Sequence, residues 1–218
     1  MIELKNVVKK YANGVVAIED LSLKLNRGEL IVLKGVSGSG KSTILSLIAG
    51  LSKPSSGDIV VDDKHISKLP DHFAAAFRRD NIGFIFQKYN LISSLSVAEN
   101  ILLPLYPLNL PKEELEPRLQ EVLNSLSIED KRDRKVKDLS GGEQQRVAIA
   151  RASINNPNII LADEPTANLD EKLSLAFIKM LEGLKASNRT VVVATHDPLF
   201  FDLESVDRVI EIRDGKVV

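Results

Sequence analysis

The sequence predicts an α/β fold with a mostly parallel central sheet, an antiparallel β part near the N-terminus and an inserted helical subdomain. Three observations lead to this prediction. Short strand-like runs open the chain, apolar β-branched runs alternate with helical patterns at both ends, and a block of helical sequence lies between them. The 218 residues are 44% hydrophobic and 27% charged, which is enough apolar material for a substantial core.

The first part of the chain is mainly strand-like. Partial alternation of apolar and polar residues, or a short apolar run that ends at a glycine, indicates strands, whereas apolar residues at helical spacing indicate a helix. The predicted elements are strands at 2–11, 20–28, 29–35, 57–63 and 81–87, and a helix at 41–51.

The remaining part begins with helices and returns to strands. The predicted elements are helices at 96–108, 112–128, 143–154 and 171–185, and strands at 158–165 and 190–197. At the end, Asp214-Gly215 between two strand-like pieces predicts a hairpin. We therefore expect one domain over 1–218, in which a core made of 1–87 and 158–218 carries a helical subdomain at 88–157.

Composition excludes several classes of protein. The formal net charge of -1 gives no global reason to bind nucleic acid, and without cysteine the chain cannot form disulfides or thiolate metal sites. No run approaches the roughly 18 apolar residues of a membrane span, and the N-terminus lacks the apolar centre of a signal peptide. We expect a cytoplasmic protein that can still dock onto membrane proteins.

A glycine-rich loop between a predicted strand and a predicted helix fits the phosphate-binding pattern G-x-x-x-x-G-K-[ST]. Its candidate nucleotide-binding residues are Gly35, Ser37, Gly38, Ser39, Gly40, Lys41, Ser42 and Thr43. Bare backbone N–H groups and the helix N-terminus suit phosphate oxygens; Lys41 would reach the β- and γ-phosphates, and Ser42 would bind Mg²⁺. The flanking strand and helix disfavour a flexible loop with a chance lysine, and they predict a P-loop NTPase core.

Two acids end the apolar strand in "IILADEP". Asp163 suits a role on Mg²⁺, and Glu164 is then free to polarise a water for attack on the γ-phosphate. Considered alone, the pair could simply begin a solvated loop that Pro165 separates from the strand. The phosphate loop upstream favours the catalytic interpretation.

Three further candidates are ambiguous in isolation. His196 follows the strand in "VVVATHD", and Gln87 ends "IGFIFQ". Such strand-end residues are more often polar loop residues or caps on exposed backbone. Tyr11 is by itself more typical of an ordinary strand tyrosine.

The stretch "LSGGEQQR" begins a predicted helix with two glycines. Ser140 and Glu143 have the spacing of a capping box, which alone explains a helix start. A capping box does not require Gly141 and Gly142, each of which weakens a helix interior by roughly 1 kcal/mol relative to alanine. Bare N–H groups at a helix N-terminus instead favour a nearby anion.

Taken in order, these motifs resemble those of ABC-type ATPases over essentially the whole chain. The stretches that carry the resemblance are "GVSGSGKST", "FQ" at 86–87, "LSGGEQQR", "IILADEP", "ANLD" at 167–170 and "ATHD". The resemblance implies a head-to-tail homodimer, in which ATP on one phosphate loop is covered by Ser140, Gly141 and Gly142 of the other subunit. It also implies that Tyr11 stacks on adenine and that Asp170 helps to join the subunits.

For the other two ambiguous residues, the resemblance implies that His196 contacts the γ-phosphate. Gln87 would sense Mg²⁺ and link the nucleotide to the helical subdomain.

The surroundings of these motifs are similar to a transporter subgroup that serves lipoprotein release and macrolide export (LolD-like and MacB-like). The resemblance implies integral membrane permease subunits as partners, and a peripheral position on the cytoplasmic face of the inner or plasma membrane. The alternative is a soluble, non-transport ABC ATPase of the cluster-assembly or repair type. Only about 120 residues separate Lys41 from Asp163, which leaves no room for the long coiled coils of some repair proteins.

Overall fold

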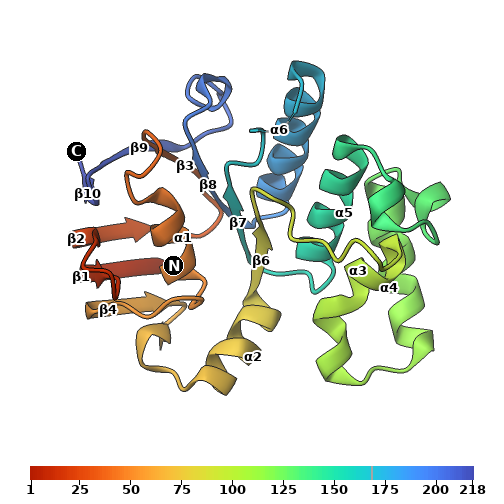
Figure 1. The fold of residues 1–218 in the computed structure, drawn as a ribbon, viewed down its shortest axis with the longest axis horizontal. Coiled ribbons are helices and arrows are strands. Elements are labelled where there is room, and N and C mark those ends of the chain that lie inside the picture. The colour runs from red at the N-terminus through yellow and green to blue at the C-terminus, as the bar shows by residue number, and fades with distance from the viewer. Residues whose placement is uncertain (168) are drawn as a thin grey trace.

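The computed structural model describes residues 1–167 and 169–218, and its strands form two sheets. The first is antiparallel and lies near the N-terminus (Figure 1). In spatial order it consists of β2 (Val16–Leu25), β1 (Ile2–Lys10), β4 (Ser56–Val61) and β5 (Lys64–His65). The predicted antiparallel β part is therefore confirmed.

The second sheet forms the centre of the molecule. In spatial order it consists of β10 (Lys216–Val217), β9 (Arg208–Arg213), β3 (Leu30–Lys34), β8 (Thr190–Thr195), β7 (Ile159–Asp163) and β6 (Ile82–Ile85). The pairs from β9 to β6 are all parallel, and β10 returns antiparallel to β9 through the predicted Asp214-Gly215 hairpin. The α/β class and the mostly parallel sheet are confirmed.

Both faces of the central sheet are buried, which explains why its strands are continuous apolar runs. On β3, Ile31 and Leu33 point into one hydrophobic cluster, whereas Leu30 and Val32 point into another on the opposite face. Helix α1 (Lys41–Ile48) contributes to the first cluster, and α6 (Glu171–Ala186) contributes to the second.

The middle of the chain has a hydrophobic cluster of its own. Helices α3 (Val97–Leu102), α4 (Lys112–Ser125) and α5 (Gly141–Ser153) supply most of its residues. Helix α5 also packs on β6, and its Ile149 and Ala152 belong to the cluster beneath the central sheet. It therefore joins the helical block to the core.

Two of the differences from the sequence prediction have a clear physical cause. Strand β2 begins at Val16 rather than at residue 20, because a pairing irregularity near Asp20 (φ 50°) shifts the buried positions from Ile18 to Leu21 and interrupts the alternation. Helix α2 (Asp71–Asn81) has no predicted counterpart, since it buries only Ala74 and Phe77. Within the described residues, no helix is long and apolar enough to cross a bilayer.

Candidate functional site

A cavity of about 260 Å³ lies over the carboxyl ends of the central strands. Its walls are phosphate-loop residues 37–43, Gln87, Glu164 and His196, together with residues 15–17. Gln87 follows β6, Glu164 follows β7, His196 follows β8 and the phosphate loop follows β3. These four strands are neighbours in the sheet, so the topology gathers residues far apart in the sequence, as expected for a ligand site in a parallel α/β fold.

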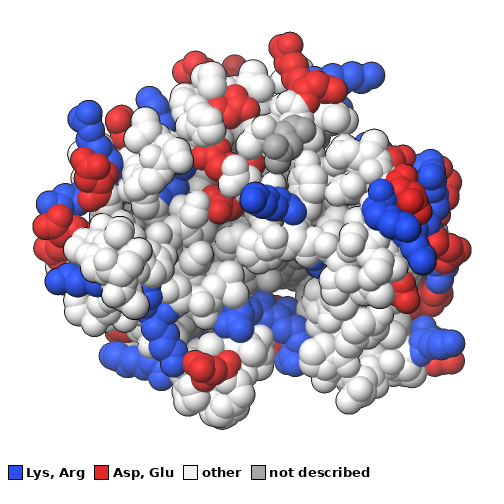
Figure 2. Space-filling view, in the orientation of Figure 1, with Lys and Arg blue, Asp and Glu red and all other residues white. Residues whose placement is uncertain are grey.

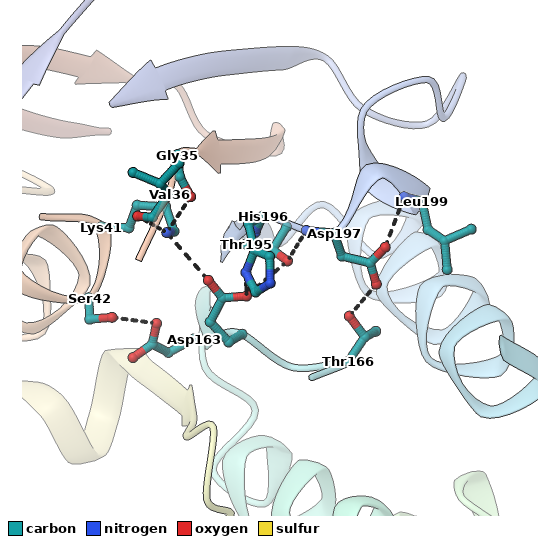
Figure 3. Close-up of polar contacts among 11 residues, drawn as sticks. Gly35, Val36, Lys41, Ser42, Asp163, Thr166, Thr195, His196, Asp197 and Leu199 are labelled. Carbon is teal, nitrogen blue, oxygen red and sulfur yellow. Dashed lines mark hydrogen bonds and ion pairs between the residues drawn. The ribbon is translucent and has the colours of Figure 1, made fainter. Parts of the chain in front are cut away.

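Lys41 is the buried cation of this cavity, with 4% of its surface exposed. Its Nζ donates hydrogen bonds to the carbonyl oxygens of Gly35 (2.7 Å) and Val36 (3.1 Å) and lies 3.3 Å from Oε1 of Glu164 (Figure 3). Helix α1 begins directly after Gly40, whose φ is 108°. A Cβ at Gly40 would lie 2.8 Å from the Ala17 carbonyl oxygen, so only glycine fits there.

Glu164 links Lys41 to His196. Its Oε2 accepts hydrogen bonds from the Thr195 hydroxyl (3.2 Å) and the His196 backbone N–H (3.4 Å), and lies 3.0 Å from His196 Nδ1. The Glu164 backbone is left-handed (φ 42°), and its N–H donates to the Ala194 carbonyl oxygen at 2.8 Å. A non-glycine residue adopts this conformation at a cost, and such strain gathers at functional sites.

The neighbouring acid, Asp163, faces the start of α1. The Ser42 hydroxyl donates a 2.8 Å hydrogen bond to Asp163 Oδ1. Burial raises the pKa of Asp163, against the lowering effect of that hydrogen bond, and the nearby Glu164 carboxylate raises it further. A hydroxyl and a carboxylate oxygen side by side, next to a phosphate loop, form a donor set that suits Mg²⁺.

Tyr11 lies at the edge of this site. Its hydroxyl is 3.3 Å from the Thr43 hydroxyl, which places the ring beside the phosphate-loop helix. The side chain is 43% exposed, and the Lys9 ammonium lies 5.2 Å from the ring centroid. The ring can therefore be reached by a flat ligand group next to the phosphate loop.

The start of α5 has the predicted capping box. Glu143 N–H donates to the Ser140 hydroxyl (3.4 Å), and Ser140 N–H donates to a Glu143 carboxylate oxygen (2.8 Å). The two glycines, however, have different surroundings. A Cβ at Gly141 would meet nothing within 4 Å, whereas one at Gly142 would lie 2.9 Å from the Leu173 side chain of α6. A larger residue at Gly142 would therefore displace the end of the Leu173 side chain, whereas Gly141 has an open approach.

Ser140, Gly141 and Gly142 of "LSGGEQQR", called the signature residues from here on, are not brought to the cavity of their own chain. None of Ser140, Gly141 and Gly142 lines it, and Figure 1 shows α5 and α1 on opposite sides of β7. Asp170 also lies outside; its carboxylate accepts a 2.8 Å hydrogen bond from Leu173 N–H and caps α6. Asn168, the second residue of the predicted "ANLD" motif, lies outside the described residues.

Some residues of the site had no counterpart in the sequence prediction. Residues 15–17 line the cavity. Val15 and Val16 are apolar but exposed, and their exposure is visible only in the structure. The Thr166 hydroxyl donates to Asp197 Oδ2 at 2.7 Å, joining the loops after β7 and β8 (Figure 3). These contacts depend on the packing of loops, which no local pattern encodes.

Comparisons with known proteins agree with this geometry. The profile of the ABC transporter family matches residues 18–167. The chain is 42% identical over 218 residues to the macrolide export ATP-binding/permease protein MacB of Campylobacter jejuni, and 40% identical over 221 residues to MacB of Salmonella typhimurium. All of this chain is covered in both alignments, but it spans only 34% of the length of either relative.

Two solved structures are similar over the full chain. The dimeric structure of MJ0796, a bacterial ABC transporter cassette, superposes with a TM-score of 0.92 at 41% identity and is covered to 96%. The same cassette in a dimeric post-hydrolysis state bound to ADP and Pi superposes with a TM-score of 0.91 at 42% identity, also covered to 96%. With the phosphate loop, the paired acids and the capped signature helix all in place, the chain belongs to the ABC transporter family.

Proposed function

We propose that the chain binds Mg-ATP and hydrolyses it within a head-to-tail homodimer that drives a membrane permease. One observation carries the proposal. Lys41, Glu164 and His196 meet over four adjacent strand ends, while the signature start of α5 in the same chain does not line that cavity. A second copy of the chain can supply the missing helix end.

Binding of ATP rests on the phosphate loop. The backbone N–H groups of residues 37–43 surround the phosphates, and Lys41 places its ammonium against the β- and γ-phosphates. Gly35 and Gly40 let the loop pass close to the backbone carbonyl oxygens of neighbouring segments. Tyr11 stacks on the adenine, which its exposed ring beside Thr43 allows.

Hydrolysis is assigned to Glu164. A carboxylate held at the cavity wall by Thr195 and His196 can accept a proton from the water that attacks the γ-phosphate. His196 contacts Glu164 through Nδ1, and an imidazole that carries a proton on both ring nitrogens can also donate to the γ-phosphate through Nε2. Lys41 neutralises charge on the phosphates once it leaves Glu164.

The oxygen donors at the start of α1 fit Mg²⁺. Ser42 and Asp163 would hold the ion, and Gln87, which lines the same cavity, would complete the protein ligands. When bound, Mg²⁺ would withdraw charge from the phosphate oxygens.

The homodimer places Ser140, Gly141 and Gly142 of one subunit over the ATP of the other, with Asp170 at the contact. The test uses two variants, Lys41→Ala and Ser140→Arg, each expected to lack turnover. Mixing them should restore ATPase activity, because the mixed dimer contains one site with both an intact Lys41 and an intact Ser140. Each variant mixed with itself is the control, and a mixture without activity would refute the arrangement in trans.

Coupling to transport is proposed to pass through the helical subdomain at 88–157, which has its own hydrophobic cluster. On the face shown in Figure 2, a hollow lies between the region of α2 and the helices to its right. We propose that a cytoplasmic helix of an integral membrane permease docks there and holds the chain on the cytoplasmic face of the membrane. Export is the favoured direction, since the MacB relatives are named for macrolide export.

The alternative is a soluble, non-transport ABC ATPase of the cluster-assembly type. Affinity purification of the chain from its native membranes distinguishes the two. A co-purifying protein with several membrane spans and a large extracytoplasmic domain supports the transporter. Recovery of soluble assembly proteins alone supports the alternative.

A further inference from the structure

The segment that follows Gln87 makes two tight turns in succession. Tyr89 N–H donates to the Phe86 carbonyl oxygen at 2.9 Å, and Asn90 N–H donates to the Lys88 carbonyl oxygen at 2.6 Å. Tyr89 (φ 58°) and Asn90 (φ 49°) are both left-handed, and neither is glycine. Two such residues in a row need support from their surroundings, because each costs free energy in this conformation.

Arg151, in the last turn of α5, supplies that support. Its Nη2 donates to the Tyr89 carbonyl oxygen and its Nη1 donates to the Asn90 carbonyl oxygen, both at 2.6 Å. These are short, charge-assisted bonds from the two arms of one planar guanidinium. The left-handed turns are what point two consecutive carbonyls toward the same cation.

The charge of Arg151 is used on these two carbonyls. Burial lowers the pKa of Arg151, so the cation sits where a charge is costly. Within residues 1–167 and 169–218 it forms no ion pair with a carboxylate. A residue needed only for packing would not place a guanidinium here, whereas one guanidinium donates to both carbonyls at once.

Helix α5 connects this contact to the rest of the site. Its 13 residues make a rod roughly 20 Å long. Ser140 caps one end, Arg151 lies near the other, and Gln145 between them donates a 2.7 Å hydrogen bond to the carbonyl oxygen of Pro165, the residue after Glu164. A rigid helix therefore touches the segments that follow both Gln87 and Glu164.

We propose that Arg151 is a positioning residue that fixes the 88–90 segment to α5 and so sets the place of Gln87 in the cavity. Movement of Gln87 and movement of the signature end of α5 are then coupled through one guanidinium. This inference rests on the proposed function only for the role of Gln87; the attachment of 88–90 to α5 stands apart from it.

The first test measures amide hydrogen exchange in the full chain without nucleotide, comparing wild type with Arg151→Lys. Lysine keeps the charge but cannot donate through a planar fork. We expect exchange at Tyr89 and Asn90 to quicken by about tenfold, as for the loss of one hydrogen bond to a charged group. The phosphate-loop amides at 37–43 should not change. Arg118→Lys, at an exposed arginine of α4, is the matched control.

Unchanged exchange at Tyr89 and Asn90 in Arg151→Lys would overturn the inference. If that variant does not fold, hydrogen exchange of the wild type at Tyr89 and Asn90 tests the contact instead. Protection of the two amides well above that of an unstructured peptide supports the contact, and exchange at the unstructured rate overturns it.

The second test is kinetic. Arg151→Lys should lower kcat for ATP about tenfold while KM stays within about twofold, because the phosphate loop is untouched. A general loss of structure would instead change both constants and lower the melting temperature. Normal kcat in this variant, with the expected loss in Glu164→Gln, would refute the positioning role and leave the proposed function standing. An inactive wild type would refute the proposed function. The hydrogen-exchange result would still show whether Arg151 holds the 88–90 segment.

Discussion

Replacing Glu164 with glutamine separates two effects that the structure assigns to one carboxylate. Glu164 Oε1 lies 3.3 Å from Lys41 Nζ, and Oε2 accepts hydrogen bonds from Thr195 and from the His196 backbone. Glutamine preserves the volume and an acceptor oxygen but removes the negative charge. We expect hydrolysis to fall, because an amide cannot accept the proton of water, and ATP binding to strengthen, because Lys41 loses a competing partner.

Both magnitudes follow from the geometry. With unit charges 3.3 Å apart and an effective dielectric constant of about 20, the attraction is about 5 kcal/mol before desolvation. Desolvation offsets most of this and leaves a net of about 1 kcal/mol, which corresponds to roughly fivefold tighter binding. Loss of a positioned general base lowers turnover by roughly 10² to 10⁴-fold.

The assay titrates a non-hydrolysable ATP analogue into dilute wild type, Glu164→Gln and the control Glu204→Gln, an exposed glutamate that does not line the cavity. Phosphate release is then measured with ATP. Wild-type turnover in Glu164→Gln would show that Glu164 is not the general base. Binding of the analogue that is weaker than in wild type would show that the Lys41–Glu164 pair does not compete with nucleotide.

Three further predictions concern single contacts. Tyr11→Leu should weaken ATP binding by about 1 to 3 kcal/mol, as for loss of base stacking, without changing the affinity for inorganic tripolyphosphate; equal affinities for ATP in variant and wild type would exclude stacking. Asp163→Asn should raise the Mg²⁺ concentration needed for half-maximal ATPase activity, and an unshifted Mg²⁺ titration would remove Asp163 from the ion site. Burial acts to raise the pKa of Asp58, but hydrogen bonds from Ser67, His65 and Lys68 lower it to about 2. The unfolded chain therefore takes up this proton more readily, and the contribution of Asp58 to stability should be lost as the pH falls from about 4 to about 2. Urea unfolding across that range should show a shallower pH dependence in Asp58→Asn, and identical slopes would contradict the cause assigned to the shift.

Local patterns predicted most of the elements because their causes are local. The strands at 29–35, 158–165 and 190–197 are continuous apolar runs because both faces of the sheet are covered, and the capping box at Ser140 needs only residues three apart. Helix α2 escaped prediction because two buried residues make too weak a stripe. Strand β2 was shortened because a pairing irregularity breaks the period that identifies strands.

The residues of the candidate site were predicted from motifs, but their arrangement was not. Asp163 and Glu164 are adjacent in the chain, yet one faces Ser42 and the other, with a left-handed backbone, faces Lys41 and His196. Arg151 carries no motif that announces its bonds to the carbonyls of residues 89 and 90.

The sequence by itself determined the α/β class, the order of the elements and the residue types that can handle a nucleotide, since helical and strand periods and the spacing of a phosphate loop are short-range properties. Tertiary structure alone decided which of these residues meet. The hairpin at Asp214-Gly215 illustrates the division: its turn is readable from two residues, yet its packing beneath the phosphate loop, where Gly215 N–H donates to the Ser39 carbonyl oxygen at 2.9 Å, depends on the parallel pairing of β9 with β3. Likewise, the two glycines of "LSGGEQQR" look equivalent in the sequence, but in the fold the Leu173 side chain of α6 lies against Gly142, whereas Gly141 is open.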